Sequence, residues 1–423
     1  MTPEQIEALG PAFAEYLQPY LFCCGYTQTF DLLGIYCRGL LSDLPRKTAE
    51  PIALACGTAV RTLQEFLKDH LWSFEQARTL LQQHVATRLP HTSADDLGTV
   101  GLIDETSTRK SGTKTPGVQR QHCGELGKIE NCIVTVHLGV LRGRYKTLID
   151  ADLFLPKSWD EDRPRCRAAG IPDDLHYRPK WQIALEQLAR ARANGVVLDW
   201  LTFDEYYGNK PGFLQGLGQS LHLVGEVPKS MRCRVPGTRQ RRASRADNLV
   251  RHSPLFTGQS WRRFHLTRQT LGQQQWDVKA GRVRWSGCGQ RPYWLIWARN
   301  VRTGEEKYFV SNAPARASLG RLLRVAFCRW NVEHEIRLSK SEIGFRHYEG
   351  RNYVGLMRHL TLCLMTLTFV AGETDRLRGE KSGTDDGTGV PGAERMLHGV
   401  AGAVAGDDTA AEQVRDHRLS PAA

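Results

Sequence analysis

Two short apolar runs, each followed at once by an aspartate, constrain the fold of this chain more than any other feature. Residues 100–103 (VGLI) are followed by Asp104, and residues 196–203 are followed by Asp204. Short apolar runs bounded by polar residues are typical of buried strands. Aspartate is common after a strand, so either residue alone has a purely structural explanation. Together they predict two strands that carry acids to one edge of a sheet.

The segments around these runs predict a mixed α/β sheet. Residues 131–140 alternate between apolar and polar side chains, 145–153 form another strand candidate, and 180–193 (KWQIALEQLARARA) have helical periodicity. Strands followed by a helix and a further strand are the pattern of such a sheet. We therefore expect an α/β fold with residues 96–224 as the first part of a core.

The rest of the chain divides by composition. Residues 1–95 have helical periodicity and are expected to form an all-helical N-terminal domain, either a scaffold or a DNA-binding domain. Residues 225–315 contain turn signals and strand-like pieces such as YWLIWARN, which predict a β-rich insertion. Helices are expected over 316–372. Residues 373–423 contain no Phe, Trp or Tyr and are expected to form a disordered tail.

Charge and cysteine usage narrow the class of protein. The chain has 57 Lys and Arg against 45 Asp and Glu, a net charge of +12, which favours a polyanionic partner such as nucleic acid. Its eleven cysteines are scattered without zinc-binding spacing and are expected to be reduced, as in a cytoplasmic protein. The N-terminus lacks the pattern of a signal peptide. The apolar run 360–371 is expected to be too short to span a bilayer.

The stretch RWNVEHEIRLSK places one acid between two cations. On an ideal α-helix, Arg329, Glu333 and Lys340 fall within about 40° of one another. Glu335 and Glu342 point roughly 160–200° away. A stripe of this kind is often only a solvated helix face. The two upstream aspartates favour a functional role for it.

Two aspartates at strand ends and a helical glutamate make up the ligand set of a two-metal phosphoryl-transfer site. Two cations about 4 Å apart would hold the attacking and leaving oxygens, and carboxylate oxygens suit Mg²⁺. Without metal, clustered carboxylates repel one another and a pKa rises. Asp104, Asp204 and Glu333 are therefore the predicted catalytic residues and metal ligands.

Two further basic segments are candidate DNA contacts. The loop 108–114 contains Lys110 and Lys114 but lacks the spacing of a nucleotide-binding P-loop. Between residues 229 and 251 there are eight basic residues and one acid, Asp247. The predicted phosphate contacts in this second segment are Arg239, Arg241, Arg242 and Arg245. A solvated loop is the alternative explanation for this segment.

The motifs, taken in order, resemble those of bacterial insertion-sequence transposases of the DDE superfamily. The resemblance covers roughly residues 15–370. In one subgroup of that superfamily the glutamate follows an Arg by four residues and precedes a Lys by seven, as Arg329, Glu333 and Lys340 do here. The tyrosine of that motif is replaced by Ala326. Other matching stretches are GLIDETS at 101–107, TPGVQRQHCGELGKIENC at 115–132, FLPKSW at 154–159, LTFDEYYG at 201–208 and GFRHYEGRNYVGLMRHLTL at 344–362.

The resemblance implies a ribonuclease-H-like core with a β-strand insertion and a chemistry that needs no covalent protein intermediate. Asp104, Asp204 and Glu333 would hold two Mg²⁺ ions, for which Mn²⁺ would substitute, and Arg329 and Lys340 would hold DNA phosphates. A water would cleave one strand at the transposon end, and the freed 3′ hydroxyl would attack target DNA. The partners implied are terminal inverted repeats, target DNA and a second copy of the chain. A nuclease without strand transfer and a catalytically inactive transposase-derived DNA-binding protein are the alternatives.

Overall fold

The computed structural model describes residues 8–92, 95–218, 220–237, 242–268, 272–285 and 291–380. These residues form two compact units. One contains residues 81–337 with 351–353, and the other contains the N-terminal helices up to residue 80 with residues 338–350 and the long helix that follows.

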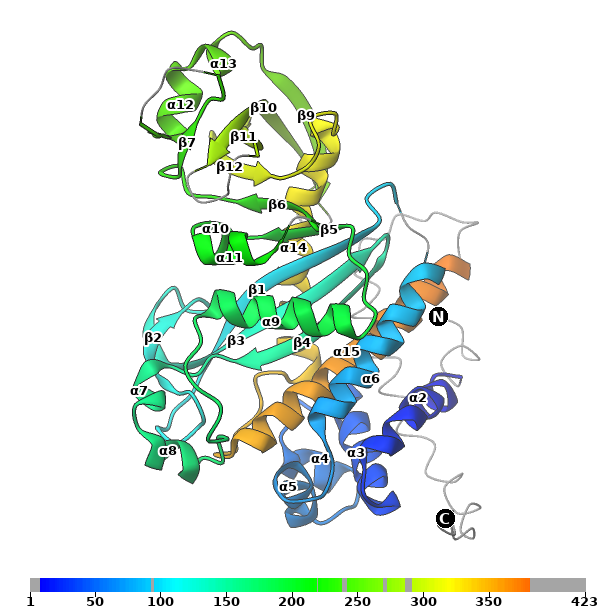
Figure 1. Cartoon of the computed structure of the whole chain (residues 1–423). Coiled ribbons are helices and arrows are strands. Elements are labelled where there is room, and N and C mark those ends of the chain that lie inside the picture. Colours follow the sequence, from blue (N-terminus) through cyan, green and yellow to red (C-terminus); the bar gives the residue numbers. More distant parts are fainter. Residues whose placement is uncertain are drawn as a thin grey trace. The chain divides into compact units, whose positions relative to one another are not determined.

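The first unit is built on a mixed sheet of the expected type. Within the described residues the sheet has 12 strands, and its core strands are β1 (Thr99–Arg109), β3 (Lys128–Arg142), β4 (Tyr145–Leu153), β5 (Trp200–Phe203) and β6 (His222–Glu226). β3 pairs antiparallel with both β1 and β4, whereas β1, β5 and β6 are parallel neighbours. The resulting order, β4-β3-β1-β5-β6, is that of a ribonuclease-H-like core (Figure 1). The expected α/β fold class is confirmed.

Short elements complete the core. β2 (Gln119–Cys123) pairs with the first residues of β3. Two short helices, α7 (Lys157–Asp160) and α8 (Arg163–Ala168), follow β4, and α9 (Lys180–Ala193) returns across the sheet to β5. α10 (Glu205–Gly208) and α11 (Pro211–Gly216) connect β5 to β6. The sequence predicted β4 and α9 with these bounds, whereas β5 is shorter than the predicted run 196–203.

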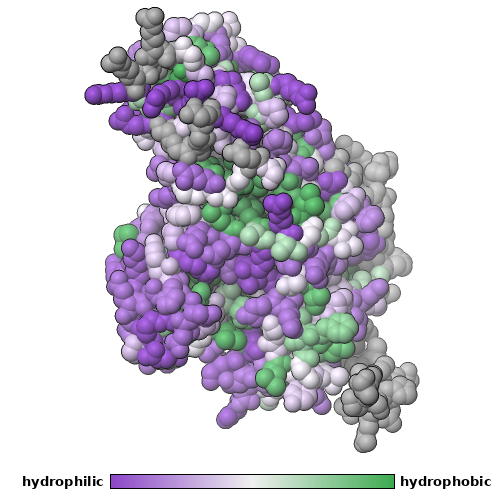
Figure 2. Space-filling view, viewed as in Figure 1, coloured by the Kyte–Doolittle hydropathy of each residue, from purple (hydrophilic) through white to green (hydrophobic). Residues whose placement is uncertain are grey.

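The β-rich segment extends the core sheet instead of forming a sheet of its own. Its strands are β7 (Arg232–Arg234), β8 (Ser244–Arg245), β9 (Arg262–Arg268), β10 (Gly272–Trp285), β11 (Tyr293–Asn300) and β12 (Glu306–Ser311), with helices α12 (Ala246–His252) and α13 (Pro254–Thr257). β12 pairs antiparallel with β6, so the hydrogen-bonded ladder continues from the core into this segment. Hydrophilic residues, purple in Figure 2, cover much of its drawn face.

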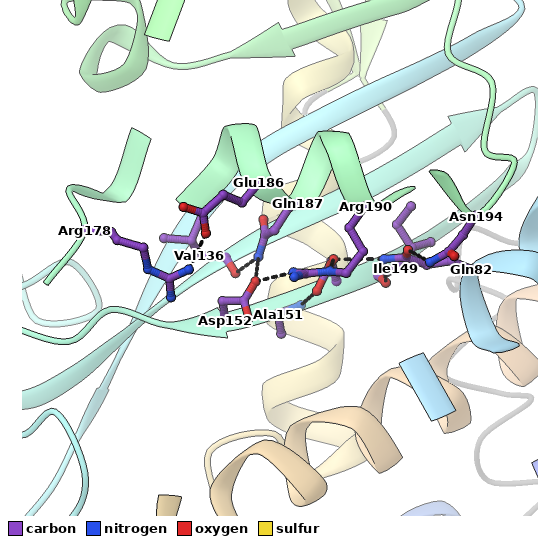
Figure 3. Close-up of polar contacts among 11 residues, drawn as sticks. Gln82, Val136, Ile149, Ala151, Asp152, Arg178, Glu186, Gln187, Arg190 and Asn194 are labelled. Atoms are coloured by element: carbon purple, nitrogen blue, oxygen red, sulfur yellow. Dashed lines mark hydrogen bonds and ion pairs between the residues drawn. The ribbon is translucent and has the colours of Figure 1, made fainter. Parts of the chain in front are cut away.

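A buried polar network fastens α9 to the sheet (Figure 3). Arg190 donates from Nε to Asp150 at 2.8 Å and from Nη2 to Asp152 at 2.5 Å. Gln187 donates to the carbonyl of Val136 at 2.9 Å, and Gln82 of α6 (Phe74–Arg88) donates to Asp150 at 2.9 Å. Asp150 and Asp152 are two residues apart on β4, so both face α9. The network fixes the rotation and position of α9 on this face of the sheet.

The second unit is helical. Its elements are α2 (Leu9–Leu17), η1 (Gln18–Cys23), α3 (Thr27–Leu41), α4 (Ala49–Ala55), α5 (Val60–Lys68), the start of α6, the π-helical turn η3 (Ser339–Ile343) and α15 (Tyr353–Glu380). A residue of α15, Arg358, connects this helix to the N-terminal helices. Arg358 donates to four carbonyls at the end of α5 and in the following turn, those of Phe66, Leu67, His70 and Trp72.

α15 differs from the sequence expectation in two ways. It continues to Glu380, so residues 373–380 are helical, while the rest of the expected tail, 381–423, lies outside the described residues. By length and composition alone it is also long and apolar enough between Tyr353 and Leu377 to cross a membrane, because the helix extends well beyond the apolar run 360–371. However, 89% of the apolar window is buried inside the protein, as in the core helix of a globular unit.

Candidate active site

Asp104 lies in the middle of a strand. β1 continues five residues further, to Arg109, because it pairs with β3 along its whole length from Thr99↔Arg142 to Arg109↔Cys132. The expectation that the strand ends at Asp104 was therefore wrong. Asp104 is 9% exposed, and its Oδ1 accepts the backbone N–H of Glu105 at 2.8 Å. Its cross-strand partner on β3 is His137, which is fully buried.

Asp204 does end a strand, as predicted. It follows Phe203, the last residue of β5, and is the N-cap of α10, accepting the N–H of Tyr207 at 3.2 Å. The parallel register pairs Leu102 with Thr202. Asp104 and Asp204 each come two residues later, on strands that are about 4.8 Å apart. The sheet therefore brings the two aspartates side by side, although 100 residues separate them in the chain.

Glu333 lies on α14 (Leu319–Leu338), and Arg329 connects it to Asp104. Nη1 of Arg329 lies 2.7 Å from Oε1 of Glu333, one turn further along the helix, and 3.4 Å from Oδ2 of Asp104. The Arg329 side chain is 14% exposed, whereas that of Glu333 is 50% exposed. A single guanidinium therefore lies between the strand acid and the helix acid.

Burial and mutual repulsion perturb the acids. The pKa of Asp104 is raised to about 7, mainly by burial, with smaller contributions from the charges of Asp204 and Glu333 and with Arg329 opposing the rise. The pKa of Asp204 is also raised, mainly by burial, with Arg329 again opposing. Burial would lower the pKa of Arg329, but its neighbours Asp104 and Glu333 outweigh burial and raise it. These shifts indicate a cluster of negative charge held together by one cation.

Glu226 is a further acid at this edge of the sheet that the sequence analysis missed. It ends β6, and because Phe203 pairs with Gly225, Glu226 comes directly opposite Asp204. Its charge contributes to the raised pKa of Asp204. It also forms an ion pair with Lys307 of β12, with 2.8 Å between Oε1 and Nζ. An acid directly after the apolar residues of a strand was the signal used for Asp204, and it applies equally to Glu226.

The side-chain directions predicted for the helix that carries Glu333 are confirmed in part. Glu335 is 3% exposed and lies 3.4 Å from Lys146, so it points away from the half-exposed Glu333, as expected. Burial raises the pKa of Glu335 to about 7, opposed by Lys146. Lys340 is not on α14. It lies in the π-helical turn η3, which belongs to the other compact unit, so the ideal-helix phase does not extend to it.

The other predicted DNA contacts lie outside this cluster. Lys110 and Lys114 follow β1, and at about 3.3 Å per residue the strand carries Lys110 roughly 20 Å from Asp104. Arg242 is exposed, whereas Arg245 forms a bidentate ion pair with Asp247, at 3.0 and 2.7 Å. Arg239 and Arg241 lie outside the described residues. Ala326, at the position of the motif tyrosine, is 5% exposed on α14.

The carboxylates are chemically suited to bind a divalent cation, but in the structure they are not spaced as a set of metal ligands. Hard carboxylate oxygens are the ligands that Mg²⁺ prefers, and repulsion between the acids would be relieved by a cation. As they stand, no three His, Cys, Asp or Glu side chains within the described residues are arranged to hold a metal ion. Arg329 lies between Asp104 and Glu333 in its place.

A ribonuclease-H-like sheet with paired aspartates next to a glutamate helix defines a class of nucleic-acid-processing enzymes, and comparison with known proteins specifies the family. The family model of the DDE superfamily endonucleases matches residues 21–287. The chain is also 30% identical over 347 residues to a probable transposase for insertion sequence element IS701 from Microchaete diplosiphon, covering 80% of this chain and 82% of that protein. This chain belongs to the DDE superfamily of transposases and endonucleases. The family match includes Asp104 and Asp204 and ends before α14.

Proposed function

We propose that this protein is a transposase that cleaves DNA strands at the ends of an insertion sequence and joins the freed ends to target DNA. The observation that carries the proposal is the in-register pair Asp104 and Asp204, joined through Arg329 to Glu333. The family membership and the net charge of +12 support it. Such a protein would act on DNA in the bacterial cytoplasm.

Asp104, Asp204 and Glu333 would hold two Mg²⁺ ions, with Mn²⁺ able to replace them. When bound, the ions supply a nucleophilic hydroxide and neutralise charge on the scissile phosphate. The sheet and the Tyr207 N–H hold the aspartates rigidly, so little reorganisation is needed at the moment of reaction. Arg329 would bind a phosphate next to the scissile bond as a bidentate donor, and the family resemblance gives Lys340 the role of a further, point-charge phosphate contact.

Arg329 would change partners during this cycle. In the structure its guanidinium neutralises Asp104 and Glu333. A cation between the carboxylates would free it to donate to a DNA phosphate. Metal and DNA would then favour each other's binding, because each removes a charge that opposes the other.

The test is a strand-cleavage assay with Mg²⁺ on DNA that contains the inverted repeats flanking the gene. Glu333→Gln keeps the size of the side chain and removes its charge, so we expect cleavage to fall by at least about a hundredfold, a barrier change of about 2.7 kcal/mol. Glu342→Gln is the matched control, because Glu342 lies in η3 beyond the end of α14. Cleavage by Glu333→Gln at the wild-type rate would exclude Glu333 as a ligand.

A second assay separates the proposal from its rivals. A pre-cleaved transposon end is supplied with plasmid target DNA, and joined products are measured. A nuclease without strand transfer gives cleavage but no joined product. A catalytically inactive descendant binds the repeats and gives neither. Because two ends must be joined together, we also expect two copies of the chain on the paired ends, measurable by sedimentation of the complex.

A further inference from the structure

Three lysines and three aromatic rings form a row of contacts that begins at Tyr206, close to the carboxylates, and ends at Lys157. Nζ of Lys210 lies 4.8 Å and that of Lys180 4.6 Å from the ring centre of Tyr206, two residues after Asp204. Lys180 also lies 5.8 Å from the ring centre of Phe154, which packs edge-on against Tyr177 at 6.0 Å. The row ends at Lys157, whose Nζ lies 5.1 Å from the ring centre of Tyr177.

The row is accessible. Lys157 is exposed and the other residues of the row are partly exposed, although rings of this size are usually buried in a core. They come from three separate parts of the first unit, the start of α7, the start of α9 and the segment around α10. Two of these parts lie in the stretches FLPKSW and LTFDEYYG. The catalytic proposal leaves these exposed side chains without a role.

The charges of the row favour an anionic partner. Lys180 is paired with Glu105 at 2.5 Å, but Lys157 and Lys210 form no ion pair within the described part of the chain. Each ammonium group makes a cation–π contact with an aromatic ring, and such a contact contributes about 0.5–1 kcal/mol at an exposed site. Because the rings restrict the long side chains beforehand, less conformational entropy is lost when a phosphate binds.

The row also lies on a defined side of the sheet. Glu105 follows Asp104 on β1, so the two side chains point to opposite faces. Asp104 faces Arg329 of α14, whereas Glu105 faces Lys180 at the start of α9. The row therefore reaches the carboxylates only at Tyr206, two residues after Asp204, and a DNA strand held at the carboxylates would have to pass the end of β5 to meet it.

We propose that Lys157, Lys180 and Lys210, held by Phe154, Tyr177 and Tyr206, bind the sugar–phosphate backbone of the DNA segment adjoining the cleavage site. The inference rests on the proposed function for the identity of the ligand. The shared chemistry is a row of phosphates, from either duplex DNA or an unpaired strand. Ammonium groups that contact backbone phosphates contribute affinity without selecting a base sequence.

The experiment measures the salt dependence of DNA binding by the full chain. Its probes are a fluorescent 30-base-pair duplex and the same duplex with a single-stranded extension. Each lost phosphate contact reduces the slope of log affinity against log salt by about 0.9 for duplex and about 0.7 for single strands. For Lys157→Gln/Lys210→Gln we therefore expect a slope reduced by about 1.8 on duplex or about 1.4 on the extension, which identifies the form that is bound.

The control Lys128→Gln/Arg192→Gln removes two positive charges at exposed positions elsewhere in the same unit and should leave the slope at the wild-type value. Tyr206→Leu, which keeps both charges but removes the ring, should weaken binding. Equal slopes for the test and control variants would overturn the row as a DNA site, as would an absence of DNA binding by the wild type. Cleavage by wild type and Glu333→Gln is measured in parallel, so a failure of the catalytic proposal is recognised separately.

Discussion

The guanidinium Nη1 of Arg329 lies 2.7 Å from Oε1 of Glu333, one turn further along α14, while it also contacts Asp104 of β1 at 3.4 Å. A helix residue therefore supplies the positive charge that the acidic cluster requires. The same contact means that an incoming cation competes with a side chain already in place.

Removal of this competing side chain should strengthen cation binding. In the absence of DNA, we expect Arg329→Gln to bind Mn²⁺ roughly tenfold more tightly than wild type, a change of about 1.4 kcal/mol, and to cleave DNA poorly because a phosphate contact is lost. Isothermal titration measures the affinity. Arg337→Gln, on the same helix, is the control. An affinity for Mn²⁺ that is unchanged or weaker in Arg329→Gln would contradict this prediction.

Substitutions of Asp204 should separate its contribution to stability from its role in DNA cleavage. Its carboxylate caps α10 through the N–H of Tyr207, and asparagine caps a helix about as well as aspartate. Asp204→Asn should therefore keep the cap but lose cleavage, and because it also removes a buried charge its midpoint should lie at or above that of the wild type. Asp204→Ala should lose cleavage and also about 1 kcal/mol of unfolding free energy relative to Asp204→Asn. Equal destabilisation of the two variants in a thermal melt would show that the cap contributes nothing.

The network of Figure 3 should dominate the stability of the α9 face. Arg190→Met leaves Asp150 and Asp152 buried without their cation, and we expect a loss of about 3–5 kcal/mol in unfolding free energy. Adding Asp150→Asn and Asp152→Asn to this variant removes the buried charges and should restore part of the loss. Denaturant titration measures both effects. No recovery in the triple variant would show that the two charges are not the cause.

Lys47 should make stability depend on pH in a predictable direction. It is 5% exposed and donates to the carbonyls of Leu40 and Glu342. Burial lowers its pKa to about 8, with Glu342, Cys363 and Asp43 opposing. The folded state therefore binds fewer protons than the unfolded state between about pH 8 and pH 10.5, and stability contributed by this group rises with pH across that window.

The measurement compares wild type with Lys47→Met. Below pH 8 the cost of burying the charge is fully present in the wild type, and it is relieved as pH rises toward the pKa of the unfolded chain. Between pH 7.5 and 10.5 the unfolding free energy of the wild type should therefore increase by up to about 3 kcal/mol relative to that of Lys47→Met. A constant difference across this range would show that Lys47 does not titrate within it.

Local patterns in the sequence determined much of the fold. The strand candidate 145–153 and the helical period of 180–193 predicted β4 and α9, because both signals are local to the chain. The apolar run before Asp204 predicted the end of β5 for the same reason. The sign of the net charge and the spacing of Arg329 and Glu333 were also available from the sequence, and the family comparison agrees with the resemblance that these motifs carry.

Only the tertiary structure decided which groups meet. Register between strands far apart in the chain places Asp204 next to Asp104 and opposite Glu226, and no local pattern encodes that register. Long-range pairing with β3 extends β1 beyond Asp104, although the apolar run stops before it. The π-helical turn at Ser339–Ile343 removes Lys340 from the phase of α14. The sequence determined the elements and the acids, whereas contacts between distant strands and helices decided the geometry of the site.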